Sequence, residues 1–389
     1  MLLGLGLSLC AIRQGHEGVP TYEWTQKTAT ASWLARDGAE LIPFLGKLWI
    51  FGGWDSGLSA PGQGGATINP GRPTCNQVLS SSDQGATWVE ELAHVESPPQ
   101  TGAGARWYRR HSHRCFPHTH AGTEYIYLVG GDHLIPGADP FGAGASNGYQ
   151  CDVWRSSNPG NANGWERVAE SDSVGWTGRM LTMPVSHGGA LYVMGGQNGL
   201  IGGPPYPFTS ALTPTFYNDV WKSTDGGATW TRILANAPWS SRGVTKAVSH
   251  NGRIWVIGGG HYPTGTAEPG GPSYVTSNPR TFFAEVWSSA DGITWTQHAN
   301  APFSPRQYPA IATWDNRIWV VGGYDNTPGN TRDFFSTANG ETWISHGNTP
   351  FSAGHADGLV GAPFGLVHAT GNGTLIDGVR DVHVLQRAA

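Results

Sequence analysis

Five arginines that recur at fixed places along the chain have the clearest capacity for binding chemistry. Each lies three residues after an aromatic side chain, in the pairs Trp33/Arg36, Trp107/Arg110, Trp176/Arg179, Trp239/Arg242 and Phe303/Arg306. A guanidinium presents five donors in a planar fork, so a ring of them would suit an anionic or polyhydroxyl ligand such as a carboxylated sugar. The alternative is that each arginine binds backbone carbonyls or carboxylates and holds the fold together. The recurrence of the arginine in each unit favours this structural role, because a ligand rarely has the same repeat symmetry as the protein that binds it.

Histidines gather in one part of the chain, at positions His111, His113, His118, His120 and His133. In a strand, His111 and His113 would point the same way, a spacing that can chelate a metal. His120 recurs at the same place as His187 and His250, which indicates a scaffold role for these three. For His111, His113 and His133, which do not follow the repeat, hydrogen bonding or exposure to solvent is the simpler interpretation. We therefore predict neither a metal site nor a cofactor.

Carboxylates suited to paired acid and base catalysis are scarce. The candidates are Asp37, Asp55, Asp132, Asp325 and Asp357. Their separations do not follow from sequence, so no glycosidase-like pair can be named.

The elements that must position these side chains form a repeat. An apolar strand ending in Gly-Gly recurs five times, reaching Gly53, Gly131, Gly196, Gly259 and Gly323. A variable segment follows, then a D-V-W triplet or a variant of it, then a turn closed by Trp. Each unit therefore contains four strands, A to D, with the arginine at the start of strand A and Gly-Gly at the end of strand B. Such units are typical of propeller blades.

A sixth unit is degenerate and stops before its strand D. It begins at Phe351 and carries Asp381-Val382-His383 in place of D-V-W. Trp24 precedes Trp33 by the same nine residues that separate Trp230 from Trp239. We therefore predict that the N-terminal strand 22–28 completes the last blade. The predicted fold is all-β, a six-bladed β-propeller of four-stranded antiparallel blades. Its blades lie at about 33–92, 107–169, 176–235, 239–298, 303–346 and 351–386, and residues 1–21 lie outside them.

The Gly-Gly strands and downstream Trp residues resemble the kelch-type, galactose-oxidase-like propellers over roughly residues 22–386. Residues 81–88 and 223–230 resemble the Asp-box, S-x-D-x-G-x-T-W. That likeness implies turns with a structural role, away from any catalytic centre. The copper site of galactose oxidase draws on a further C-terminal domain and a cross-linked Cys–Tyr, and this sequence offers no match to it. Nor can the arginine triad and Tyr/Glu pair of sialidases be placed. The resemblance to kelch-type N-acetylneuraminate epimerase implies a six-bladed enzyme without a metal as an alternative.

Composition agrees with a turn-rich β protein. The chain has 389 residues with 57 Gly, 27 Pro and 18 Trp, while charged residues make up 13%. A net charge of -5 gives no basic footprint for nucleic acid, and no apolar run is long enough for a membrane span. Residues 2–12 resemble a short signal sequence but lack its basic start and its cleavage pattern. Cys75 and Cys151 occupy similar places in successive units. They would either pair across blades or remain buried thiols, and we favour the thiols.

The long connections between strands B and C share one face of the ring with the D–A connections. Loops on a rigid scaffold are where binding usually occurs, so we predict a ligand site at the mouth of the central channel on this face. The arginines start strand A on the same face, and in the sixth unit the aligned place is Gly354, followed by His355. The predicted site comprises Arg36, Arg110, Arg179, Arg242, Arg306, His355, Trp54, Asp55, Asp132, His133, Asn198, His261, Tyr262, Tyr324 and Asp325.

These features favour a non-catalytic recognition propeller that binds a glycan or a protein partner. Its expected location is extracellular or on a virion surface, where the N-terminal segment would dock on another subunit. Two alternatives remain open. One is a cofactor-free sugar-active enzyme, an epimerase or a lyase, with its site at the channel mouth. The other is a purely structural subunit of an assembly.

Overall fold

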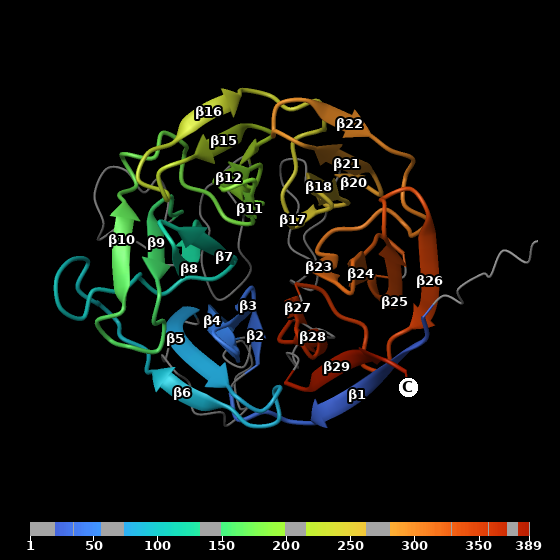
Figure 1. Cartoon of the computed structure of the whole chain (residues 1–389), viewed down its shortest axis with the longest axis horizontal. Coiled ribbons are helices and arrows are strands. Elements are labelled where there is room, and N and C mark those ends of the chain that lie inside the picture. The colour runs from blue at the N-terminus through green and yellow to red at the C-terminus, as the bar shows by residue number, and fades with distance from the viewer. Residues whose placement is uncertain are drawn as a thin grey trace, which may run out of the picture.

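The computed structural model is an all-β ring of six blades around a central axis (Figure 1). It describes residues 20–33, 35–55, 74–132, 149–198, 215–261, 281–327, 329–356, 358–371 and 380–388, with only the backbone for Trp54 and Asp55. No helix in these ranges is long and apolar enough to cross a membrane. The predicted fold class is confirmed.

Each blade is a four-stranded antiparallel sheet in which strand A lies nearest the axis (Figure 1). The first three blades consist of β3 (Glu40–Phe44), β4 (Lys47–Asp55), β5 (Thr74–Ser81) and β6 (Val89–Leu92); β7 (Arg114–His120), β8 (Thr123–Val129), β9 (Val153–Ser156) and β10 (Trp165–Ala169); and β11 (Val185–His187), β12 (Ala190–Met194), β15 (Val220–Ser223) and β16 (Thr231–Leu234). The fourth and fifth consist of β17 (Ala247–His250), β18 (Arg253–Ile257), β21 (Val286–Ser289) and β22 (Trp295–Gln297), then β23 (Ala310–Trp314), β24 (Arg317–Tyr324), β25 (Asn330–Thr337) and β26 (Trp343–Asn348).

Short ladders extend three blades on the side of the B–C connections. They are formed by β2 (Arg36–Asp37) on β4, by β13 (Gln197–Asn198) with β14 (Thr215–Phe216), and by β19 (Gly260–His261) with β20 (Thr281–Phe282). β13, β14, β19 and β20 flank the B–C connections of their blades, whereas β2 lies in a D–A connection and pairs with the end of strand B.

The two ends of the chain meet in the sixth blade. This sheet has the order β1 (Tyr22–Thr28), β29 (Val382–Arg387), β28 (Gly365–Ala369) and β27 (Gly358–Ala362). The blue N-terminal strand lies antiparallel beside the red β29, with Trp24 opposite Leu385 (Figure 1). The prediction that the N-terminal strand completes the last blade is confirmed.

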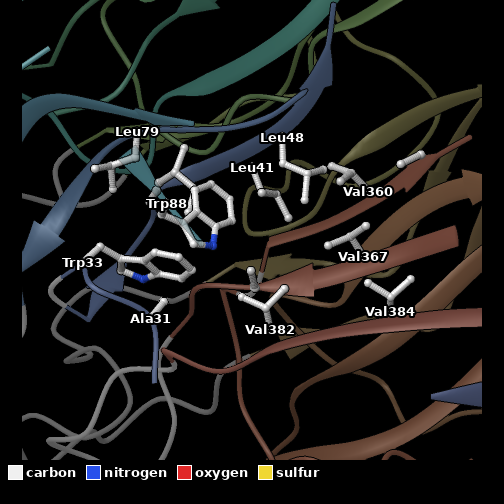
Figure 2. Close-up of a cluster of buried hydrophobic side chains, with 14 residues drawn as sticks. Ala31, Trp33, Leu41, Leu48, Leu79, Trp88, Val360, Val367, Val382 and Val384 are labelled. Atoms are coloured by element: carbon white, nitrogen blue, oxygen red, sulfur yellow. The ribbon is translucent and has the colours of Figure 1, made fainter. Parts of the chain in front are cut away.

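Six hydrophobic clusters fill the spaces between neighbouring blades. Figure 2 shows the cluster that joins the sixth blade to the first, where Val367, Val382 and Val384 face Leu48 and Trp88. An edge-to-face aromatic pair recurs in these clusters between the residue that begins a blade and the Trp that closes its C–D turn. The pairs are Trp33/Trp88, Trp107/Trp165, Trp176/Trp230, Trp239/Trp295, Phe303/Trp343 and, through the N-terminal strand, Phe351/Trp24. Burial of these rings drives the blades together.

The C–D turns are held by their own side chains, as the sequence predicts. In residues 81–88, the Ser81 Oγ accepts the Gly85 N–H at 2.9 Å and Asp83 accepts the Thr87 N–H at 2.8 Å. The indole of Trp88 donates to the Gly85 carbonyl at 3.0 Å. The same three hydrogen bonds recur in residues 223–230. These groups stabilise the turn.

Strand A begins later than the sequence predicts. Outside the short β2, the strand starts four to six residues after the recurrent arginine rather than at it. The residue two positions after each arginine has a positive φ, for example 51° at Ser112 and 53° at Leu181. A non-glycine residue in this region interrupts a regular strand. His111 and His113 therefore do not share one side of a strand, and the geometric premise of a chelating pair is wrong.

Replacing Trp24 by Ala tests how the ring is closed. Trp24 packs edge to face on Phe351 with ring centroids 5.1 Å apart. We expect Trp24→Ala to lower the free energy of unfolding by about 3 kcal/mol, the lower end for a Trp→Ala change because the side chain is partly buried. Urea denaturation measures this, with the exposed Glu23→Ala as control. Equal stability of the two variants would mean that the N-terminal strand does not close the ring.

His346 makes the fifth blade sensitive to acid. Its ring stacks on Trp319 and Phe334, contacts Tyr22, and lies where burial lowers its pKa to about 4. The unfolded chain, with a pKa near 6.5, binds the proton more readily, so stability falls as the pH drops from about 6.5 to about 4. We expect His346→Gln to lose less stability over this range in thermal melts. A loss identical to that of the wild type would contradict the assignment.

Candidate functional site

The recurrent arginines point into their own blades. In the second blade, Arg110 binds Asp152 in a bidentate pair, with N–O distances of 2.6 and 3.0 Å. It also donates to the carbonyl of Gly130 at 3.0 Å. The indole of Trp154 donates to the same carboxylate at 2.7 Å. Burial alone would raise the pKa of Asp152, but the Arg110 guanidinium outweighs this effect and lowers it.

This arrangement repeats around the ring. Every one of the five guanidiniums donates to the first glycine carbonyl of its Gly-Gly pair at 3.0–3.1 Å. The side chain that precedes or lies within strand C is the partner: Gln77 for Arg36, Asp152 for Arg110, Asp219 for Arg179, Glu285 for Arg242 and Asp333 for Arg306. The D-V-W triplet is thereby explained, because its acid binds the arginine and its Trp binds the acid.

The backbone at the same arginines joins each blade to the one before it. The second glycine N–H of a blade donates to the carbonyl of the next blade's arginine at 2.9–3.1 Å, as from Gly131 to Arg179. Gly131 has a φ of 95°, and an added Cβ would lie 2.9 Å from the His111 carbonyl. Gly354 accepts this bond in the sixth blade, and Gly371 donates to Arg36 to close the circle.

All five arginines are buried, and none of the five is more than 1% exposed. The structure thus supports the structural alternative for them, with the side chain bound inside its own blade and the backbone bound to the neighbour. Ligand binding by these side chains stays a prediction. His355, at the corresponding place in the sixth blade, is also buried and lies 2.8 Å from Asn330 Oδ1.

The channel is narrow at the predicted mouth. The positive-φ residues of the six blades meet around the axis there, and they are Gly38, Ser112, Leu181, Val244, Tyr308 and Ala356. Backbone hydrogen bonds link them between blades, from Ser112 to Gly38, from Leu181 to Ser112 and from Tyr308 to Val244. Leu181, Val244 and Tyr308 belong to a buried apolar cluster. The arginines therefore surround a tightly packed end of the channel.

The other predicted site residues fall into three groups. Asp132 is buried and pairs with His111, and Asp325 is buried and accepts hydrogen bonds from Ser304, Thr327 and Gly329. Asn198, His261 and Tyr324 are partly exposed on the B–C side. His133 and Tyr262 lie outside the described residues, as do the side chains of Trp54 and Asp55. Of the other candidate carboxylates, Asp357 also lies outside them and Asp37 is half-buried in β2.

Partly exposed aromatic rings accompany Asn198, His261 and Tyr324 on the B–C side. His261 lies between Phe216 and Phe283, with ring centroids 6.0 and 5.7 Å away. Burial lowers the pKa of His261, which favours the neutral ring. Tyr324 packs edge to face on Phe282. The B–C side thus offers aromatic faces and neutral polar groups.

A cavity of about 210 Å³ lies on the axis, nearer the opposite face. Its floor is made by Glu40, Arg114 and Lys246, three charged side chains from different blades. The sequence reasoning missed them. The sequence does mark these residues, because each lies four positions after a recurrent arginine, at the start of the innermost strand or directly before it, in a chain with few charges.

The described part of the chain contains no group of three His, Cys, Asp or Glu side chains placed to hold a metal ion. Cys75, Cys115 and Cys151 are free and buried, so the thiol interpretation of Cys75 and Cys151 is confirmed. His187 and His250 each donate from Nε2 to a backbone carbonyl of the next blade, at Ala290 and Ala338 respectively, in agreement with a scaffold role.

No protein-family model matches the chain, and no curated protein matches its sequence. The class that the fold defines is a six-bladed β-propeller with four-stranded blades.

Removing one recurrent arginine tests the buried ion pair that it forms at strand C of its blade. Arg179→Met would leave the Asp219 carboxylate buried without its cation, and breaking a buried pair in this way costs about 3–5 kcal/mol. We expect a loss of this size in chemical denaturation. Arg332→Met, at an exposed arginine of β25 in another blade, is the matched control and should change stability by less than about 0.5 kcal/mol. Equal losses for the two variants would refute the structural role.

Proposed function

We propose that this chain is a non-catalytic recognition propeller that binds a glycan or protein partner through the face that carries the B–C connections. The observation that carries the proposal is the set of partly exposed aromatic rings there, Phe216, His261, Phe283 and Tyr324, on a rigid ring of blades. Aromatic faces stack on sugar rings and also anchor protein partners.

Contacts with buried arginines and with Asn198 hold two aromatic side chains of this face in position. The guanidinium of Arg179 lies 3.6 Å from the ring centroid of Tyr217, and the Tyr217 hydroxyl accepts a hydrogen bond from Asn198 at 2.7 Å. The guanidinium of Arg242 lies 4.2 Å from the centroid of Phe283. These cation–π contacts hold Phe283 of the proposed face, and Tyr217 in the same face, against buried guanidiniums. Pre-set aromatic side chains lose little entropy on binding.

The sequence resemblances agree with this proposal. The Gly-Gly repeat resembles kelch-type propellers, and the turns at 81–88 and 223–230 resemble Asp-boxes that stabilise the far face. An extracellular or virion-surface location, with residues 1–21 docked on another subunit, belongs to the same proposal. A sugar-active enzyme has less support, because two of the described candidate carboxylates, Asp132 and Asp325, are buried and hydrogen bonded or ion paired, which leaves the half-buried Asp37 of β2 as the third.

A glycan array at low salt, probed with labelled protein, tests the proposal. We expect a subset of glycans to bind, and His261→Ala combined with Tyr324→Ala to reduce that binding at least about tenfold, in line with the loss of two stacking rings. Ile293→Ala, at an exposed residue of a C–D turn on the other face, is the control and should bind normally.

Uniformly flat binding across acidic and neutral glycans would overturn the glycan form of the proposal. Retained binding by the double variant would show that the aromatic rings of this face do not form the site.

A further inference from the structure

The central cavity is lined by residues of β3, β7, β17, β23 and β27, together with Lys246 before β17 and Pro184 before β11. These strands are the innermost of their blades (Figure 1). Its walls are mostly apolar and include Leu41, Phe116, Ile311 and Leu359. Pro43, Pro117, Val248, Thr313 and Gly361 line it at positions that are partly or fully exposed, whereas Glu40 and Arg114 are buried. The cavity therefore opens on the side of the A–B turns, away from the proposed recognition face.

The floor of the cavity is an ionic cluster. The Glu40 carboxylate accepts from Arg114 Nη1 at 2.7 Å and from Lys246 Nζ at 3.2 Å. Arg114 also donates to the carbonyls of Thr182 and Thr245, at 3.2 and 3.3 Å. The Arg114 guanidinium thus has three hydrogen-bond acceptors. Among the described residues, the ammonium of Lys246 pairs with Glu40.

The cluster carries one more positive than negative charge. One carboxylate faces two cations, and an uncompensated charge in a largely apolar enclosure is unfavourable. Burial lowers the pKa of Lys246, an effect that Glu40 opposes and Arg114 reinforces. An ammonium has three donors, of which the bond to Glu40 uses one, so Lys246 can bind an anion. A single negative charge at this place would neutralise the cluster.

We propose that the central cavity binds a small monocarboxylate with an apolar body, with the carboxylate on Lys246 and the body against the apolar walls. One excess charge matches a monoanion better than a dianionic phosphate. A volume of about 210 Å³ exceeds the roughly 150 Å³ of an engineered apolar cavity that holds benzene, so it accommodates a substituted ring or a short branched chain. The Lys246 side chain is 18% exposed and the cavity is open on one side, so contact between the apolar walls and the body of the ligand would add to the ion pair.

This site is independent of the recognition face, because it opens at the other end of the channel and uses none of the B–C connections. Its failure would leave the proposed function untouched, and the reverse also holds.

Isothermal titration of the full chain with benzoate tests the inference, with benzyl alcohol and inorganic phosphate as comparison probes. We expect saturable benzoate binding at one site per chain, with weaker binding of the neutral alcohol and of phosphate. Lys246→Met should weaken benzoate at least about tenfold, since it removes the anion's partner. Glu40 keeps Arg114 as its partner in this variant, so the fold is retained.

Two further variants locate the site. Thr313→Trp, at the open end of the cavity, should also abolish benzoate binding. Lys222→Met, at a lysine whose Nζ lies 5.3 Å from the Tyr192 ring, is the matched control and should bind benzoate as the wild type does. Absence of saturable benzoate binding up to about 10 mM, or equal binding by Lys246→Met and the wild type, would overturn the inference. Tighter binding of phosphate than of benzoate would overturn the monocarboxylate assignment.

Discussion

A buried arginine at the inner end of a blade is the interaction on which the rest of this structure depends. Its guanidinium joins strand B to strand C through a glycine carbonyl and a carboxylate, and its backbone carbonyl accepts from the preceding blade. Taking a guanidinium out of water costs several kcal/mol unless its donors find partners. The bidentate carboxylate and the backbone carbonyl supply those partners. The same residue therefore fixes the sheet of its own blade and the position of the neighbouring blade.

The sixth blade lacks this arginine and is completed in another way. Gly354 keeps the backbone acceptor, and the N-terminal strand supplies both strand D and the ring of Trp24. Because the guanidiniums of the recurrent arginines are bound within the blades, the groups that can contact a ligand lie in other parts of the molecule. Aromatic rings characterise the B–C side, and the cluster of Glu40, Arg114 and Lys246 characterises the axis.

Much of the fold can be predicted from the sequence, because Gly-Gly, D-V-W and the turn-closing Trp each perform one local task in every blade. The spacing of Trp24 even predicts how the ring closes. The start of strand A could not be predicted, since the positive φ of Ser112 or Leu181 comes from blades meeting at the axis and not from local preference. The cluster of Glu40, Arg114 and Lys246 was missed although each residue lies four positions after a recurrent arginine, because only the closed ring shows that residues as far apart as 40 and 246 are in contact.

A double-mutant cycle at Arg179 and Asp219 tests the central claim most directly. Stability would be measured by urea denaturation for the wild type, Arg179→Met, Asp219→Leu and the double variant. If the buried pair joins the strands as described, removing both partners costs less than the sum of the single losses, with a coupling energy of at least about 1.5 kcal/mol. A coupling energy near zero would show that the arginine and the carboxylate act separately, and it would contradict this account of how the blades are held.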